Sequence, residues 1–167
     1  MSNTAVNLQD AFAGESQANR KYLFFAEKAD KDGYTQIARL FRAAAEAETV
    51  HAHNHLNAME GIGATENNLK ADISGENHEF TKMYPGFIEQ AASENNNKAE
   101  RSFRLANTVE ETHHELYQKA LETLKSGQQM KDEPYFVCQI CGHTVGGEAP
   151  ERCPVCSAPG SKFKKVE

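Results

Sequence analysis

The stretch FRAAAEAETVHAHNH, residues 41–55, decides the fold because it joins a strong helix former to ionisable groups at a regular spacing. Alanine has the highest helix propensity of the amino acids. On such a helix Phe41, Glu48 and His51 share one side, since residues three, four and seven apart lie above one another. The stretch therefore predicts an amphipathic helix that carries a carboxylate and an imidazole on its apolar face.

The same pattern recurs in FRLANTVEETH, residues 103–113. The corresponding pairs are Phe41 and Phe103, Arg42 and Arg104, Glu48 and Glu110, and His51 and His113. The segments that precede the two copies also correspond, because Gly14-Glu15 aligns with Gly75-Glu76. These matches predict two copies of one helical hairpin, each with one glutamate on its first helix and a Glu-x-x-His motif on its second.

Four amphipathic segments are predicted between about Thr4 and Ser126, a region rich in residues that favour helix. The first segment ends near Gly33 and the second near Gly61, while the fourth follows the polar run at residues 93–97. The third begins near Thr65 as its N-cap and contains Pro85, which predicts a kink. Four long helices with short connections predict an all-α four-helix bundle.

The repeated motifs predict a metal site inside this bundle. The residues that would converge there are Glu15, Glu48, His51, Glu76, Glu110 and His113. Burying four unpaired carboxylates costs several kcal/mol for each ion, so positive charge must compensate them. Two metal ions meet this need, and carboxylate and imidazole ligands without thiolates suit iron or manganese. One Glu from each of two helices and a Glu-x-x-His from each of the others is the arrangement known for di-iron bundles.

Some neighbouring residues allow two interpretations. Glu79 lies three residues after Glu76 and is either a fifth carboxylate at the site or a solvated side chain. Tyr22 and Tyr84 either donate hydrogen bonds to ligand carboxylates or fill the core. His55 is either structural or an outer-sphere partner of the site. His53, His78 and His114 are expected at the surface.

The last part of the chain predicts a second metal site. Cys138-x-x-Cys141 and Cys153-x-x-Cys156 provide four thiolates, which bind zinc or a single iron ion tetrahedrally. Spacing alone favours a zinc ribbon, whereas a redox-capable site on the same chain favours iron. We expect a helical domain at 1–127, a linker at 128–134 and a small four-cysteine module at 135–167, which is too short to fold without a metal.

The bulk composition excludes several function classes. The net charge of −6 argues against a nucleic-acid partner. No apolar run approaches the ~18 residues that span a bilayer, so no membrane partner is expected. The N-terminus has no pattern of a secretory signal, which predicts a cytoplasmic protein with reduced cysteines.

The chain resembles the rubrerythrin family, in which a ferritin-like di-iron bundle precedes a rubredoxin-like module. The segments that carry the resemblance are AFAGESQANRKY, FRAAAEAETVHA, GENHEFTKMYPGF, VEETHHELY and the CQICGH and CPVC motifs. It implies that an oxo- or carboxylate-bridged di-iron site is bound by Glu15, Glu48, Glu76, Glu79, Glu110 and His113, with His51 as the alternative to Glu79. One iron would move between His51 when reduced and Glu79 when oxidised, and Glu48 and Glu110 would bridge. His143 departs from the family, since an aromatic residue such as Tyr is usual there.

The resemblance further implies a peroxidase that reduces hydrogen peroxide to water and serves in oxidative-stress defence. Electrons would pass through the iron bound by Cys138, Cys141, Cys153 and Cys156, from rubredoxin or a separate NAD(P)H-dependent reductase. No glycine-rich dinucleotide motif is present. The resemblance implies a homodimer, or a higher homo-oligomer, in which one subunit's thiolate-bound iron faces the other's di-iron site. The alternatives are a ferroxidase or iron-storage protein, and a non-enzymatic zinc-ribbon interaction module.

Overall fold

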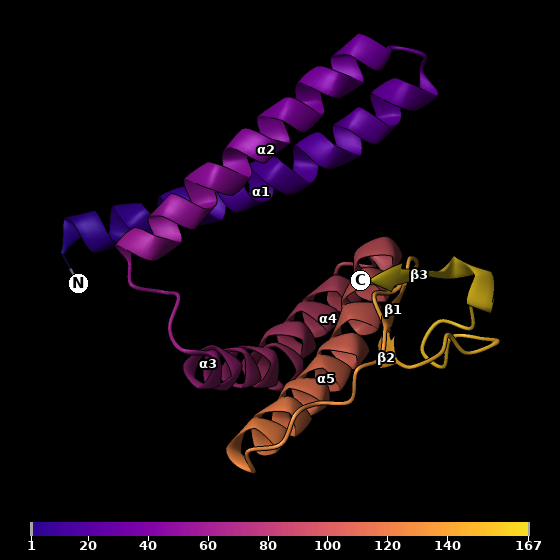
Figure 1. Cartoon of the computed structure of the whole chain (residues 1–167). Coiled ribbons are helices and arrows are strands. Elements are labelled where there is room, and N and C mark those ends of the chain that lie inside the picture. The colour runs from indigo at the N-terminus through magenta and orange to yellow at the C-terminus, as the bar shows by residue number, and fades with distance from the viewer. Residues whose placement is uncertain (1, 167) are drawn as a thin grey trace. The chain divides into compact units, whose positions relative to one another are not determined.

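The computed structural model describes residues 2–166, which form two units that meet in sequence between Gly63 and Ala64. The first unit contains α1 (Asn3–Lys31) and α2 (Thr35–Ala58). The second contains α3 (Thr65–His78), the π-helix η1 (Glu79–Met83), α4 (Tyr84–Ser93), α5 (Asn97–Lys125), β1 (Tyr135–Cys138), β2 (Thr144–Gly146), the 3₁₀ helix η2 (Gly160–Lys162) and β3 (Phe163–Val166). Figure 1 shows the helices and the small strand module at the C-terminal end. In the described residues no helix is long and apolar enough to cross a membrane.

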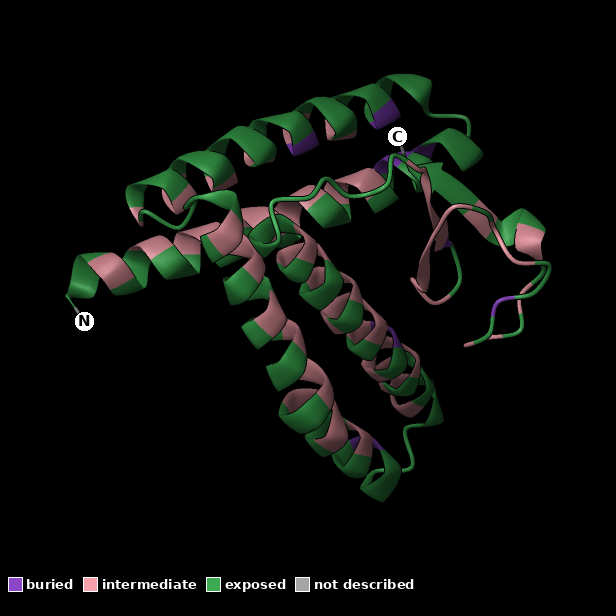
Figure 2. Cartoon of the chain, turned by 60° about the horizontal axis from the view of Figure 1, so that its bottom comes forward, coloured by how far each residue is buried: buried purple, intermediate pink, exposed green. Residues whose placement is uncertain are grey.

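The helices α1 and α2 form a hairpin that packs through alanines. The chain turns at Gly33, whose φ of 85° lies in the left-handed region that glycine adopts readily. Ala26, Ala29 and Ala38 are buried at the closed end, with Phe41 packed against them. Because alanine side chains are small, the two helices approach closely there. Few positions on the helices are buried, as Figure 2 shows. The Asn19 side chain ties the hairpin further, since it donates to the Ala45 carbonyl at 2.7 Å.

The third predicted segment is interrupted by a π-helix. Both α3 and α4 pack on α5, and η1 lies between them in sequence. The sequence predicts a kink at Pro85. In the structure the helix is instead irregular just before this proline, in the π-helix Glu79–Met83. A proline cannot donate a backbone hydrogen bond, and the wider π-turn that precedes it changes the local bonding pattern. Single π-turns within helices are frequent at functional sites.

The C-terminal module is a three-stranded antiparallel sheet in the order β2-β1-β3. Phe136 of the central strand pairs with Val145 on one side and Lys165 on the other. Among its described residues only Cys138 and Cys153 are buried, with 1% and 2% exposed. A module whose core consists of two thiols needs a metal to hold it together.

The module lies against α5 within the second unit (Figure 1). A Cβ atom added to Gly142 would lie 3.6 Å from Cγ1 of Val109, which is only 2% exposed. Val109 thus packs toward the turn that carries Cys141.

The architecture confirms the predicted class, a mostly helical protein with a small four-cysteine module. The helix ends agree closely with the sequence pattern, since α1 ends at Lys31 and α5 begins at Asn97. Thr65 is the first residue of α3 and not its N-cap, a position that Ala64 occupies. The division into domains at residues 127 and 134 stays a prediction.

Candidate metal centres

The first hairpin brings together a carboxylate and imidazole cluster. One ligand atom each of Glu15, Glu48 and His51 lies within 4.8 Å of the others. Glu15 comes from α1, whereas Glu48 and His51 lie one turn apart on α2. Nδ1 of His51 is 2.8 Å from Oε2 of Glu48. The His51 side chain is 54% exposed, so it has room to move.

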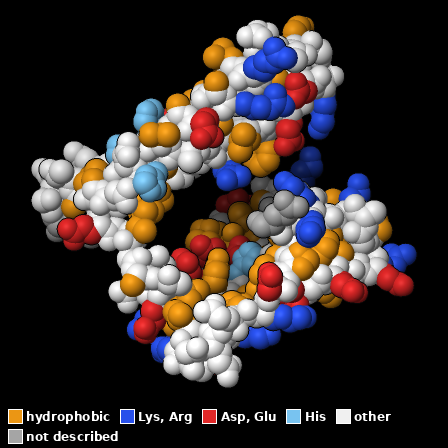
Figure 3. Space-filling model, in the orientation of Figure 1, with side chains coloured by type: hydrophobic (Ala, Val, Ile, Leu, Met, Phe, Trp, Pro, Cys, Tyr) orange, Lys and Arg blue, Asp and Glu red, His pale blue; other side chains and the backbone are white. Residues whose placement is uncertain are grey.

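The second unit repeats this cluster with Glu76, Glu110 and His113, whose ligand atoms also lie within 4.8 Å of one another. Glu76 lies near the end of α3, while Glu110 and His113 lie one turn apart on α5. Nδ1 of His113 is 2.8 Å from Oε2 of Glu110, which matches the distance in the first cluster. Figure 3 shows acidic and histidine side chains gathered among apolar ones on one face of these helices.

The electrostatics of the second cluster favour a bound cation. Burial and the neighbouring Glu110 carboxylate raise the pKa of Glu76 to about 7. Burial and the same acidic groups raise the pKa of Tyr84. A carboxyl that resists ionisation beside other carboxylates lacks a compensating positive charge. Since a metal ion would supply that charge, the residues present fit the group that the sequence predicts.

Glu79 lies at the edge of this cluster. It is the first residue of η1 and is partly buried, although its ligand atoms are not within the tight group of three. Burial and then the Glu110 charge raise the pKa of Glu79, so its carboxyl faces the same acidic field. The first hairpin has a regular α-helix and Ala18 at the corresponding place.

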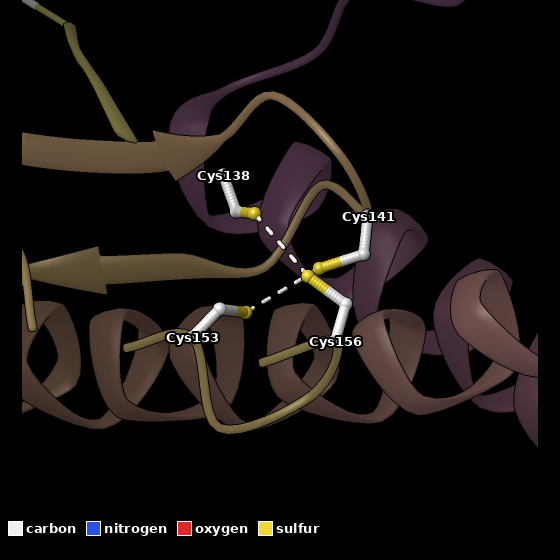
Figure 4. A group of neighbouring side chains, drawn as sticks. All are labelled: Cys138, Cys141, Cys153 and Cys156. Atoms are coloured by element: carbon white, nitrogen blue, oxygen red, sulfur yellow. Dashed lines mark hydrogen bonds between the residues drawn. The ribbon is translucent and has the colours of Figure 1, made fainter. Parts of the chain in front are cut away.

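The four cysteines converge from two turns of the module (Figure 4). Sγ of Cys138 lies 3.7 Å from Sγ of Cys156, and Sγ of Cys141 lies 3.5 Å from Sγ of Cys153. Tetrahedral ligands at ~2.3 Å from a metal are themselves ~3.8 Å apart, so the spacing fits a tetrathiolate site.

The thiols of the two turns differ: the pKa of Cys138 is lowered, whereas burial raises the pKa of Cys141 and of Cys156. Burial disfavours the charged form of Cys138, but hydrogen bonds from the backbone N–H groups of Ile140 and Cys141 lower its pKa to about 7. Backbone N–H groups of the first turn therefore point at the Cys138 sulfur. His143 takes the position of the usual aromatic residue, with its ring edge-on to Phe163 at 6.5 Å.

The structure confirms the expected surface position of two histidines and corrects that of a third. His53 and His78 are exposed, as expected. The expectation for His114 is wrong, because its Nδ1 lies 3.0 Å from the Ile73 carbonyl and its ring packs on Phe80. His114 follows His113 by about 100° around the helix, so it points toward α3.

The two tyrosines pack as core residues. The Tyr22 ring lies 6.2 Å from that of Phe41, and the Tyr84 ring lies 6.2 Å from those of Phe87 and Phe103. His55 is partly buried.

Thr144 is a neighbour of the second cluster that the sequence does not indicate, and its Oγ1 lies 3.0 Å from Nε2 of His113. No local pattern marks this threonine, because the contact joins segments 31 residues apart.

These features define a class: helical proteins with glutamate and histidine metal clusters joined to a tetrathiolate module. The rubrerythrin family profile matches residues 7–121, and the profile described as rubrerythrin, rubredoxin-like domain, matches residues 136–164. The chain belongs to the rubrerythrin family. It carries that family's di-iron domain and its four-cysteine iron module.

Individual relatives cover almost the whole chain. Rubrerythrin-2 of Clostridium acetobutylicum is 35% identical over 175 residues, which cover 96% of this chain and 95% of the relative. Nigerythrin of Nitratidesulfovibrio vulgaris is 36% identical and covers 96% of this chain, with 85% of its own length matched. A solved structure of partially reduced nigerythrin has a TM-score of 0.59 at 34% identity, and the match covers 99% of this chain and 88% of that chain.

Proposed function

We propose that this protein is a di-iron peroxidase that reduces hydrogen peroxide to water in oxidative-stress defence. The observation that carries the proposal is the presence, on one chain, of two matched carboxylate and imidazole clusters and a tetrathiolate site. Solved nigerythrin structures include a mixed-valence state and a fully reduced, all-ferrous state, so iron in that relative changes oxidation state. A redox-active pair of irons with an attached one-electron centre suits a two-electron reduction.

The residues of the two clusters have distinct roles in this proposal. Each cluster provides the donors for one iron: Glu15, Glu48 and His51 in one, and Glu76, Glu110 and His113 in the other. When bound, the two iron ions supply the two electrons that O–O cleavage requires and act as Lewis acids toward peroxide. Glu48 and Glu110 would be shared ligands of the two irons, as the family resemblance implies, and each lies 2.8 Å from the histidine of its own cluster.

His51 would hold an iron in its reduced state, and Glu79 would hold it in its oxidised state. The His51 side chain is largely exposed and therefore free to move. Glu79 lies on the π-turn and already experiences the charge of Glu110. An additional carboxylate stabilises the more highly charged metal, whereas a neutral imidazole suits the reduced one.

The tetrathiolate module transfers electrons and does not bind peroxide. Four cysteines complete a tetrahedral site, so no position remains for a substrate. The electrons come from a soluble donor such as rubredoxin or a reductase that uses NAD(P)H. We place the protein in the cytoplasm, where a reducing environment keeps the four free cysteines available for metal.

The protein functions as a homodimer or a higher homo-oligomer in this proposal. Phe24, Phe25 and Leu40, near the closed end of the first hairpin, are 63%, 49% and 68% exposed. Large apolar side chains that cluster on a surface are typical of an interface. Light scattering on the iron-loaded protein should therefore give a mass of at least two chains.

Rapid mixing tests the proposed chemistry. Fully reduced, iron-loaded protein is mixed anaerobically with hydrogen peroxide, and oxidation of the iron is followed by absorbance. We expect His51→Ala and Glu79→Ala to slow the oxidation about tenfold or more, because each removes a ligand of one oxidation state. His53→Ala is the matched control, since His53 is an exposed neighbour on the same helix. The ligand exchange is wrong if both variants react at the rate of the parent.

A further inference from the structure

The stretch that contains the π-turn is one residue longer than its counterpart in the first hairpin. Tyr22 follows Glu15 by seven residues. Tyr84 follows Glu76 by eight. The two glutamates belong to matching clusters, and each tyrosine ring lies 6.2 Å from the ring of the matching phenylalanine on the following helix. Both ends of the stretch therefore correspond, and the extra residue is accommodated in η1, where the Tyr84 N–H donates to the Glu79 carbonyl five residues earlier.

One side chain of α5 contacts the chain on both sides of the two glutamates Glu76 and Glu79. Nδ1 of His114 lies 3.0 Å from the carbonyl oxygen of Ile73, one turn before Glu76 on α3. A carbonyl oxygen only accepts, so Nδ1 carries the ring proton and donates it. The ring of His114 also packs edge-on against Phe80, the second residue of η1, with 5.4 Å between ring centroids and 63° between planes.

The first hairpin has neither the π-turn nor this side chain. The repeat places Ala52 where the second hairpin has His114, and α1 is an α-helix throughout Asn3–Lys31. An alanine side chain can neither donate a hydrogen bond nor stack on a ring. Because a regular α-helix is the ordinary state of such a segment, contacts with another element must favour the π-turn. His114 supplies such contacts in the hairpin that has the π-turn.

We propose that His114 is the positioning residue of the π-turn: it holds Ile73 and Phe80 on α5 and so sets where Glu79 lies relative to the second cluster. His114 follows the ligand His113 in sequence, but it is not a member of the cluster itself. The proposal rests on the proposed function in one respect, that Glu79 binds iron in the oxidised state.

Hydrogen exchange tests the first part of the proposal. The full chain is loaded with zinc, a redox-inert substitute for iron, and exchange of backbone amides is followed by mass spectrometry. His114→Ala removes both contacts, so the amides of η1 should exchange about tenfold faster, while those of α1 and α2 stay unchanged. His114→Asn keeps a donor at the place of Nδ1 and should exchange within about threefold of the parent, since it lacks only the ring contact.

Gln118→Ala is the matched control, because Gln118 is exposed one turn after His114 on the same helix. Phe80→Leu removes the ring contact from the other side, and it should speed exchange in η1 alone even if His114→Ala folds poorly. The proposal is overturned if exchange in η1 is unchanged, if it rises equally throughout α3, η1 and α5, or if His114→Asn behaves like His114→Ala.

The midpoint potential of the iron-loaded carboxylate site tests whether His114 acts through Glu79. His114→Ala should raise this potential, because the oxidised state loses a well-placed anionic ligand. In a Glu79→Gln background the same substitution should cause no further shift, whereas additive shifts would overturn the proposal. If Glu79→Gln alone leaves the potential unchanged while His114→Ala still speeds exchange in η1, the role of Glu79 in the proposed function is rejected and the role of His114 in the π-turn is supported.

Discussion

At the scale of single residues, the molecule is organised around carboxyl groups that lack a countercharge. Glu76 and Glu79 both face Glu110, and each has a raised pKa. His113 is the nearest positive group, and its pKa is raised through its hydrogen bond with Glu110. When no metal is bound, the carboxyl groups of this cluster repel one another in the folded chain. A bound metal ion relieves this repulsion, so folding creates a site with affinity for metal.

The pKa of Glu76 predicts how the stability of the metal-free protein depends on pH. The folded state binds this proton up to pH about 7, whereas the unfolded chain releases it near the ordinary value of 4.5. Between these values the folded state holds more protons, so the free energy of unfolding falls as pH rises. The raised pKa of His113 acts in the same direction, because its stabilising charge is lost as pH rises. Denaturant unfolding across this range measures the effect.

A neutral variant isolates the contribution of Glu76. Glu76→Gln cannot ionise, so its stability should depend less on pH than that of the parent. Metal binding displaces the proton, and the affinity of the parent for a divalent ion should therefore rise with pH through about 7. An unchanged pH dependence in Glu76→Gln would reject this account of the cluster.

At the scale of elements, each hairpin positions its ligands through the close approach of its helices. Ala38 is fully buried between α1 and α2, where only a small side chain fits. In the second unit, the π-turn at η1 positions Glu79 at the edge of the cluster of Glu76, Glu110 and His113. The regular helices thus set the spacing between the ligand residues, and the π-turn changes the position of Glu79 relative to them.

Ala38→Leu should disturb this approach. Adding a large side chain to a packed position costs about 1–3 kcal/mol of unfolding free energy. Ala43→Leu is the matched control, because Ala43 is exposed on the same helix and its replacement should change stability by less than about 0.5 kcal/mol. Equal effects in the two variants, measured by denaturant unfolding, would mean that the hairpin is not packed as described.

The module should depend on its metal while the helices do not. Cys153→Ser removes one of four ligands and one of its two buried thiols, so the strands should lose their NMR dispersion. Helical circular dichroism should persist, because α1 to α5 lack these ligands. Gln139→Ala, at an exposed position in the other cysteine turn of the module, serves as the control. A Cys153→Ser module that stays folded would contradict the role assigned to the metal.

At the scale of the whole molecule, the internal repeat explains why so much could be predicted. The matched motifs around Glu48 and Glu110 locate two clusters from the order of amino acids alone, since three-residue spacing fixes a helix face. The π-turn could not be predicted, because the spacing of Glu76 and Glu79 fits a regular helix equally well. The contact of Thr144 with His113 depends on how separate segments pack, and no local pattern encodes it.

Iron stoichiometry and spectroscopy of the fully loaded chain, prepared without oxygen, test the central claim most directly. We predict two irons bound by carboxylate and imidazole for each iron bound by four thiolates, separated by Mössbauer spectroscopy. Glu48→Ala combined with Glu110→Ala should remove the former signal and leave the thiolate signal unchanged. Fewer than two irons per chain outside the sulfur site in the parent protein would contradict the account.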